Sequence, residues 1–277
     1  MDRLSSVLSA FRPRTTAVTG LFAQASAQPL ALKSPACYWL YGLAGEVILK
    51  DQQDRHLRLH QGEGAWLASG IHFTLTTGTT EQASQLLICE YDFASKALNP
   101  LLDADLPWVK ITEKEDIGQS LRPLNGILIE EFVQARCGSQ VVLERLAEAL
   151  LVQLLRLFMQ NNRMPSGLLA GLSDAKLARA IVAMHEQPEQ PWHLDDLAAL
   201  AGMSRSSFSR AFRDTLAMTP MAYLTLWRMR VAAQRLKSGD KNLALLSDEL
   251  GYQSEAAFRR SFKKVMGVPP GAISRAY

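Results

Sequence analysis

The sequence predicts an α+β protein with an amino-terminal β-barrel or jelly roll, a pair of linking helices, and a carboxy-terminal all-α region that contains two helix-turn-helix units. Three observations predict this class. Short strand-like runs separated by glycines fill the first 94 residues, the apolar residues take a helical period from about residue 124, and one helical pattern occurs twice after residue 190. With 277 residues, 48% of them hydrophobic and 21% charged, the chain is long enough for two domains and is unlike a disordered or fibrous protein.

The amino-terminal region is predicted to begin with a short helix and to continue as strands. Leu4, Val7, Leu8 and Phe11 follow the i, i+3, i+4, i+7 spacing of a helix that docks one apolar face. The strand-like runs cover residues 37–41, 46–49, 56–59, 65–67, 73–76 and 85–91. Short strands at this spacing, with glycines between them, are typical of a barrel or jelly roll.

Two helices are predicted between residues 124 and 160, with a break at residues 137–139. Leu146, Leu150 and Leu154 step by four residues along the second helix, so they form either a self-association stripe or the face that covers the barrel. A polar stretch rich in helix breakers, residues 161–167, is the predicted linker. The expected domains are therefore residues 1–120 for the sheet domain, 121–164 for the linker and dimerisation helices, and 173–277 for the helical region.

The helical region contains an internal repeat at an offset of fifty residues. Each copy has a serine that can cap a helix, a phenylalanine pair spaced i, i+4 and a closing proline, at Ser204, Phe208, Phe212 and Pro220 and again at Ser254, Phe258, Phe262 and Pro270. A short apolar helix and a glycine turn precede each copy, with Gly202 in the first and Gly251 in the second. A helix-turn-helix unit needs such a glycine for the left-handed backbone of its turn. The repeat thus predicts two of these units.

The phenylalanine pairs fix which face of each second helix points outward. The outward stripes carry Ser206, Ser209, Arg210 and Arg213 in the first unit and Ala256, Arg259, Arg260 and Lys263 in the second. Arginine can bridge guanine O6 and N7 or bind a phosphate, serine can reach phosphates or base edges, and alanine can meet a thymine methyl. Together with Arg205 and Glu255, the stripes form the predicted DNA-binding set. The alternative is that the two hairpins belong to a partner-binding bundle and that the arginines form an ordinary solvated face.

Charge and helix length favour DNA binding by this region. Residues 1–172 hold 15 Lys and Arg against 17 Asp and Glu, whereas residues 173–277 hold 15 against 10, so the net charges are −2 and +5. Between the repeats, residues 221–237 predict an amphipathic helix with Leu224, Trp227, Val231 and Leu236 as its buried positions. A continuous helix of roughly 16–18 residues, at 1.5 Å each, spans much of the ~34 Å between successive major grooves.

These residues carry a resemblance to a known family. Residues 173–277 resemble the AraC/XylS-type transcriptional regulators, through Trp192, Leu197–Ala198, Gly202–Ser206, Phe208, Phe212, Pro220, Tyr223–Leu224, Trp227–Met229, Ala232–Ala233, Gly251–Phe258, Phe262–Lys263 and Gly267–Pro270. Residues 1–160 are similar to the cupin-type sensor domain that one subgroup of these regulators carries. The resemblance implies a cupin-like barrel that senses an unidentified small-molecule or redox signal. It also implies a homodimer that binds double-stranded promoter DNA and contacts RNA polymerase, usually as an activator.

Two positions depart from the family pattern. After the final proline the family usually has Tyr-Arg, whereas this chain has Ile273 and Ser274. A threonine commonly caps the first helix of the first repeat, whereas this chain has His193. The cap of that helix must therefore come from elsewhere or be weaker by about 1 kcal/mol.

The cupin resemblance raises an enzyme as the alternative, namely a metal-dependent cupin with a helical appendage. Metal cupins hold their ion with two or three histidines and a glutamate on facing strands, and the candidates here are His56, His60, Glu63 and His72. The sequence lacks the HxH pair with its following glutamate that such cupins show. We therefore expect no metal, no other cofactor and no enzymatic activity.

Several residues of the barrel are candidates for the signal site. The predicted ligand-binding set is Trp39, Tyr41, Trp66 and His72, although the aromatic residues, with Phe73, would otherwise form the barrel core.

The three cysteines, an odd number without a CxxC pair, argue against a disulfide framework. Cys89 lies in an apolar run and is either a buried strand cysteine or a redox sensor that could pair with Cys37. The first residues contain no apolar signal core and no stretch predicts a membrane span, so we expect a cytoplasmic protein.

Overall fold

The computed structural model describes residues 2–23, 30–32, 36–68, 72–77, 83–93, 99–102, 108–112, 116–161, 166–240 and 242–273. The chain divides into two compact units. The sheet unit comprises residues 13–93 and 105–157, and the helical unit comprises residues 1–12, 94–104 and 158–277. The domains expected from the sequence are continuous stretches, whereas each unit combines separate segments. Part of the predicted linker, residues 162–165, and Ser274 lie outside the described residues.

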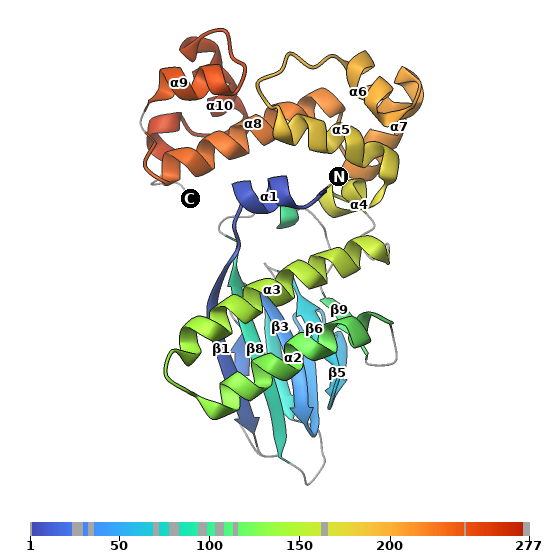
Figure 1. The fold of residues 1–277 in the computed structure, drawn as a ribbon, viewed down its shortest axis with the longest axis vertical. Helices are drawn as coiled ribbons and strands as arrows, with labels where there is room; N and C mark the ends of the chain where they lie inside the picture. Colours follow the sequence, from blue (N-terminus) through green and yellow to red (C-terminus); the bar gives the residue numbers. More distant parts are fainter. Residues whose placement is uncertain are drawn as a thin grey trace. The chain divides into compact units, whose positions relative to one another are not determined.

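The sheet unit contains two antiparallel sheets (Figure 1). The five-stranded sheet has the order β1-β8-β3-β6-β9 and the four-stranded sheet has the order β2-β7-β4-β5. All six predicted strand runs are strands, and β1, β2 and β9 are additional. The bounds are β1 (Arg14–Ala23), β2 (Leu30–Leu32), β3 (Cys37–Ala44), β4 (Glu46–Asp51), β5 (His56–His60), β6 (Gly64–Leu67), β7 (Phe73–Thr77), β8 (Ser84–Asp92) and β9 (Trp108–Ile111).

An apolar core lies between the two sheets. Alternate residues of each strand supply it because side chains along a strand point to opposite faces. Tyr38 and Leu40 of β3 pack there with Leu49 of β4, Leu59 of β5 and Phe73 of β7, all of them buried. Apolar side chains from both sheets therefore fill the interior of this jelly-roll-like unit.

Two long helices cover the outer face of the five-stranded sheet (Figure 1). They are α2 (Asp116–Gln134) and α3 (Ser139–Gln160), which match the predicted helical pair. Asn125 of α2 accepts a hydrogen bond from Trp39 Nε1 at 3.2 Å, and the backbone carbonyl of Ala147 in α3 accepts one from the Tyr91 hydroxyl at 2.9 Å. Leu150 and Leu154 are fully buried. Of the two alternatives for the leucine stripe, the structure therefore favours the one that covers the sheet.

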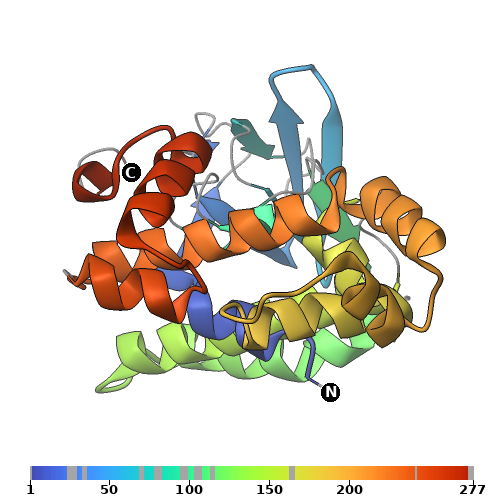
Figure 2. The same cartoon turned by 90° about the horizontal axis from the view of Figure 1, so that it is seen from above.

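The helical unit is built from short helices around one long one. Its helices are α1 (Ser5–Ala10), α4 (Leu168–Ser173), α5 (Ala175–Glu186), α6 (Leu194–Ala201), α7 (Arg205–Leu216), α8 (Pro220–Lys237), α9 (Leu243–Glu249) and α10 (Glu255–Met266), with 3₁₀ turns η1 (Pro100–Leu102) and η2 (Pro270–Ala272). Figure 2 shows α6 and α7 at one end of α8 and α9 and α10 at the other. No helix among the described residues is long and apolar enough to cross a membrane.

The amino-terminal segment belongs to the helical unit although the sheet unit follows it in sequence. Its predicted docking helix is α1, and Leu4, Val7 and Phe11 are buried. Arg3 donates hydrogen bonds to the carbonyls of Leu172 and Ser173 at 2.9 and 3.2 Å. The first twelve residues are thus bound to α4 and its neighbours by both apolar packing and hydrogen bonds.

Candidate nucleic-acid interface

The first helix-turn-helix unit consists of α6 and α7. Helix α6 ends at Gly202, whose φ of 64° is the left-handed turn that the sequence predicts. Ser204 then caps α7 by accepting a hydrogen bond from the backbone N–H of Ser207 at 3.3 Å. The start of α6 lacks the usual threonine cap, but the carboxylate of Asp196 accepts a hydrogen bond from the backbone N–H of His193 at 3.0 Å, as in one half of a capping box. Local signals therefore define both ends of the turn.

Phe208 and Phe212 set the rotation of α7. Both rings are fully buried, with centroids 5.5 Å apart, and Phe212 meets the Tyr223 ring of α8 edge to face at 5.6 Å. Arg205, Ser206, Arg210 and Arg213 are exposed and Ser209 is half-buried. Arg205 also pairs with Asp195 of α6 across 3.3 Å between two exposed side chains. The face opposite the phenylalanines is thus polar and basic.

The second unit repeats this arrangement with α9 and α10. Ser254 caps α10 by accepting from the backbone N–H of Ala257 at 3.2 Å, and Phe258 and Phe262 are fully buried at 5.7 Å between centroids. The exposed members of the predicted set are Ala256, Arg259, Arg260 and Lys263, while Glu255 is half-buried. The adjacent Lys264, which was not predicted, is exposed as well.

One ion pair in α10 joins two residues of the predicted DNA-binding set. Arg259 Nε donates to Glu255 Oε1 at 2.7 Å, an i, i+4 pair on the same helix face. Both side chains are more than a third exposed, so the pair adds little stability and is free to exchange partners. Arg210 and Arg260 are exposed as well. Each unit therefore presents a solvent-facing arginine near the middle of its second helix.

The two units share α8, whose 18 residues lie within the predicted length of roughly 16–18. Thr219 caps its start by accepting from the backbone N–H of Ala222 at 3.3 Å. Of the predicted buried positions, Leu224 and Trp227 are buried whereas Val231 and Leu236 are half-buried against the core of the second unit. At 1.5 Å per residue this helix is about 27 Å long and so spans much of the ~34 Å between successive major grooves.

Sequence reasoning missed two arginines of α8. Arg228 donates to backbone carbonyls of residues 188 and 190, and Arg235 bonds to Asp240 and Glu249. Both lie on the face of α8 that also carries the predicted apolar positions Leu224 and Val231. The available signal was their spacing of seven residues, which returns to one helix face and sets them apart from Arg230 and Lys237 of the same helix.

The candidate metal ligands of the sheet unit do not converge. His56 and His60 share one face of β5, as their spacing predicts, but both are exposed on that face. His60 lies 3.8 Å from Glu46 and His56 lies 3.8 Å from Asp54, while Glu63 binds Lys110 at 2.6 Å. His72 is exposed at the start of β7. Within the described part of the chain, no three His, Cys, Asp or Glu side chains are grouped as a metal site would require.

The predicted ligand-binding aromatics lie on the helix-covered face and not inside the sandwich. Trp39 is paired with Trp66 of β6 on one side and with Cys89 of β8 on the other, so these three side chains form a row across the outer face of the five-stranded sheet. The Tyr41 ring stacks on Trp39 at 6.5 Å. His72 belongs to the other sheet. The arrangement therefore brings Trp39, Tyr41 and Trp66 together under the helices and leaves His72 apart.

Burial makes Cys89 a poor nucleophile. Its side chain lies in the row beneath the helices, and burial raises the pKa of the Cys89 thiol to about 12. Cys37 is equally buried, and Cys137 is exposed. An activated thiol needs the opposite shift together with access. The geometry favours the buried strand cysteine over the redox sensor.

Family models and relatives agree with both halves of this description. A model described as a helix-turn-helix domain matches residues 197–276, and one described as a cupin matches residues 2–160. A putative AraC-like transcription regulator of Streptomyces lividans is 31% identical over 228 residues, which cover 82% of this chain and 69% of the relative. A transcriptional regulator of Haemophilus influenzae, described as an uncharacterized protein of the helix-turn-helix type, is 35% identical over 156 residues, 56% of this chain. The aligned part spans about half of that second relative, 52% of its length.

Some solved structures are also similar in sequence. One of them is a transcriptional regulator from Chromobacterium violaceum that belongs to the proteins containing an AraC-type DNA-binding domain. It is 26% identical, and the match covers 36% of this chain and 89% of that one with a TM-score of 0.34.

Proposed function

The chain belongs to the AraC family of DNA-binding transcriptional regulators that carry an amino-terminal cupin domain, and on that premise we propose that it places α7 and α10 in two successive major grooves of one promoter duplex. The observation that carries the proposal is the matched pair of exposed basic stripes, each opposite a buried phenylalanine pair, at the two ends of α8. Arg205, Ser206, Ser209, Arg210 and Arg213 form the first contact set. Glu255, Ala256, Arg259, Arg260 and Lys263 form the second.

A titration against salt tests this proposal. We expect the full chain to enrich a discrete duplex from a random library and to bind it with an affinity that falls steeply as salt rises, because phosphate contacts release counterions. Binding to an unrelated duplex should be weaker by about 10³-fold or more at the same salt. Equal affinity for both duplexes, or affinity that salt does not change, would refute a sequence-specific regulator.

The proposal includes a signal that acts through the cupin unit and an output at promoters. The signal is a small molecule or a redox change, and the buried, weakly acidic Cys89 favours the small molecule. Activation through contact with RNA polymerase and a cytoplasmic location complete the proposal. The relatives are transcription regulators, and the described residues of the sheet unit include no group of metal ligands that would favour the alternative of a metal-dependent enzyme.

We also propose that the protein is a homodimer joined through the hairpin of α2 and α3. This hairpin exposes large apolar side chains that are unusual on a solvated helix pair, with Ile127 52%, Val133 71%, Val141 61% and Val142 42% exposed. The double variant Val133→Lys, Val141→Lys should sediment as a monomer while the unchanged chain sediments as a dimer. A variant that remains a dimer would place the contact elsewhere.

A further inference from the structure

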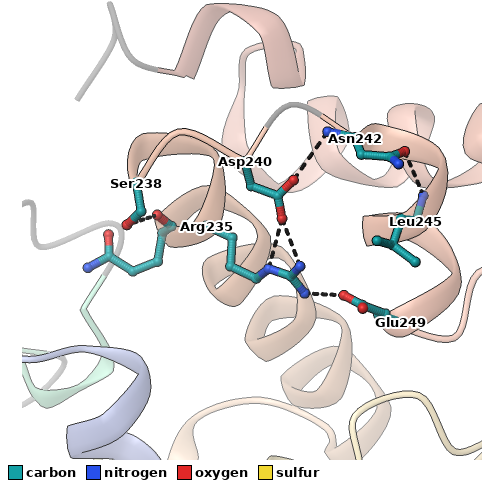
Figure 3. A network of polar contacts seen from close by, with 7 residues as sticks. Arg235, Ser238, Asp240, Asn242, Leu245 and Glu249 are labelled. Carbon is teal, nitrogen blue, oxygen red and sulfur yellow. Dashed lines mark hydrogen bonds and ion pairs between the residues drawn. The ribbon is translucent and has the colours of Figure 1, made fainter.

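Helix α8 carries two arginines on one face that hold other parts of the helical unit. Arg228 and Arg235 are seven residues apart, which is close to two helical turns. Figure 3 shows Arg235 donating to the Asp240 carboxylate and reaching Glu249 near the end of α9. Asp240 in turn accepts from the backbone N–H of Asn242, the residue that caps α9. Arg235 therefore fixes α9 to the carboxyl end of α8, within the second helix-turn-helix unit.

Arg228 makes contacts of a different kind because they reach both units. Its Nε donates to the backbone carbonyl of Pro188 at 2.5 Å, and its Nη2 donates to the carbonyl of Gln190 at 2.9 Å. These carbonyls belong to the loop that leads into α6 of the first unit. The same guanidinium lies 5.8 Å from the ring centre of Tyr252, in the turn of the second unit. One side chain thus touches the entry to the first unit and the turn of the second.

The backbone at Gly251 also packs against the loop that leads into α6, and so adds to the contact that Arg228 makes between the two units. The residue has φ of +74°, and a Cβ there would lie 2.3 Å from the carbonyl oxygen of Glu189 and 3.0 Å from Arg228 Nη2. At the corresponding turn residue of the first unit, Gly202, an added Cβ would meet nothing within 4 Å. Both glycines serve a left-handed turn, but only the second turn is packed against the other unit. The asymmetry shows a contact that the repeat by itself does not require.

Tyr252 connects Arg228 with α10, the second helix of the second unit. Its hydroxyl lies 2.9 Å from Ser261 Oγ of α10, and its ring meets Phe258 of the same helix edge to face at 5.6 Å. On the other side, Trp192 Nε1 donates to the carbonyl of Gln187 at 3.0 Å and so closes the loop before α6. A continuous set of contacts therefore runs from the loop before α6, through Arg228 and Tyr252, to α10.

We propose that Arg228 is a positioning residue that fixes the distance and rotation between the two helix-turn-helix units, and thereby the spacing between the two half-sites that the protein accepts. The inference rests on the proposed function, in which both units bind one duplex. One base pair inserted between half-sites moves the second by about 3.4 Å and rotates it by about 34°. Two helix-turn-helix units held rigidly by Arg228 cannot adjust to that change. Without the Arg228 contacts, the two units can shift and bind both half-sites in part.

The test compares spacing tolerance between the unchanged chain and Arg228→Ala, using the full-length protein. The probes are the duplex that the unchanged chain enriches from a random library and two derivatives with one base pair inserted or deleted between its half-sites. We expect the unchanged chain to lose about tenfold or more in affinity on each derivative, as for loss of register in one half-site. For Arg228→Ala we expect weaker binding to the original duplex and a loss of no more than about threefold on the derivatives, because a loosened pair adapts.

Three further variants distinguish a loss of the Arg228 contacts from a simple loss of positive charge. Arg179→Ala removes the same charge from an exposed position on α5 and should keep the strict spacing of the unchanged chain. Arg228→Lys keeps the charge but not the forked donor that binds two carbonyls, so it should relax the spacing as well. Gly251→Ala, which forces a methyl group against Glu189, should do the same without altering any charge. If Arg228→Ala does not fold, these last two variants carry the test.

Each outcome decides the proposal. If folded Arg228→Ala, Arg228→Lys and Gly251→Ala each lose as much affinity as the unchanged chain when the half-site spacing is altered, the positioning role of Arg228 is overturned. Equal affinity of the unchanged chain for all three spacings also overturns it, while DNA binding itself stands. Failure of the unchanged chain to enrich any duplex refutes the proposed function, and the inference with it.

Discussion

The imidazole of His185 lies flat against the indole of Trp227, with ring centroids 3.5 Å apart and planes 13° apart. Its Nε2 is 2.6 Å from the Tyr223 hydroxyl and its Nδ1 is 3.2 Å from the Ser6 hydroxyl. His185 lies in the last turn of α5, yet its side chain is buried. Burial lowers the pKa of His185 from 6.5 to about 3. The folded protein therefore holds this histidine neutral.

The free energy of unfolding should fall as the pH decreases below 6.5, toward the lower pKa of folded His185. Below pH 6.5 His185 becomes protonated in the unfolded chain but stays neutral in the folded protein. The free energy of unfolding therefore decreases by at most about 1.4 kcal/mol for each unit by which the pH is lowered. Urea unfolding followed by tryptophan fluorescence between pH 7 and pH 5 measures this slope. His185→Gln should flatten it, and an unchanged slope in that variant would assign the dependence to other groups.

The central arginines of the two stripes should read bases. Arg210→Ala and Arg260→Ala are each expected to weaken binding to the enriched duplex by about 1–3 kcal/mol and to relax sequence preference, because a bidentate contact to guanine is lost. Titrations with the enriched duplex and with a scrambled duplex of equal length provide the measurement. Equal losses on both duplexes would assign these arginines to phosphates.

The phenylalanine pairs should dominate the stability of the two units. Phe212→Ala and Phe262→Ala each remove a fully buried ring, so each should reduce the free energy of unfolding by about 3–5 kcal/mol. Leu245→Ala, at a site 49% exposed, serves as the control and should change it by less than about 0.5 kcal/mol. Thermal or urea unfolding compares the three, and a small effect of both phenylalanine variants would contradict the packing described.

The cysteines should differ in reactivity. In the folded protein, a thiol reagent should label Cys137 quickly and Cys37 and Cys89 only after denaturation, because the latter two are buried and burial raises the pKa of Cys89 to about 12. Mass spectrometry of the labelled chain counts the modified sites.

Replacement of Cys89 separates the two kinds of signal. Cys89→Ser should leave the response of the regulator intact if the signal is a small molecule. Loss of a response to oxidant in that variant would instead favour the redox signal, and a promoter reporter measures either result.

The sequence predicts the DNA-binding elements well because their signals are local. Capping serines, turn glycines and i, i+4 phenylalanines each act within one or two helical turns, and so the boundaries of α7 and α10 follow from them. The faces of the sheet residues were harder to predict. Residues 37–40 are buried on both sides of β3, and a strand covered on both faces lacks the alternation that would show which side chains face the sandwich interior. That is why the sequence does not show that Trp39 and Trp66 lie on the face covered by the helices.

By itself the sequence determined the two-part organisation, the duplicated helix-turn-helix units and the outward stripes, since periodicity and capping depend on neighbouring residues. Only the tertiary structure decided the docking of α1 in the helical unit, the burial of His185 and the bridge made by Arg228. These features depend on contacts between residues far apart in the chain, such as the 40 positions that separate Arg228 from Pro188. Packing and hydrogen bonding at that separation leave no periodic trace in the sequence.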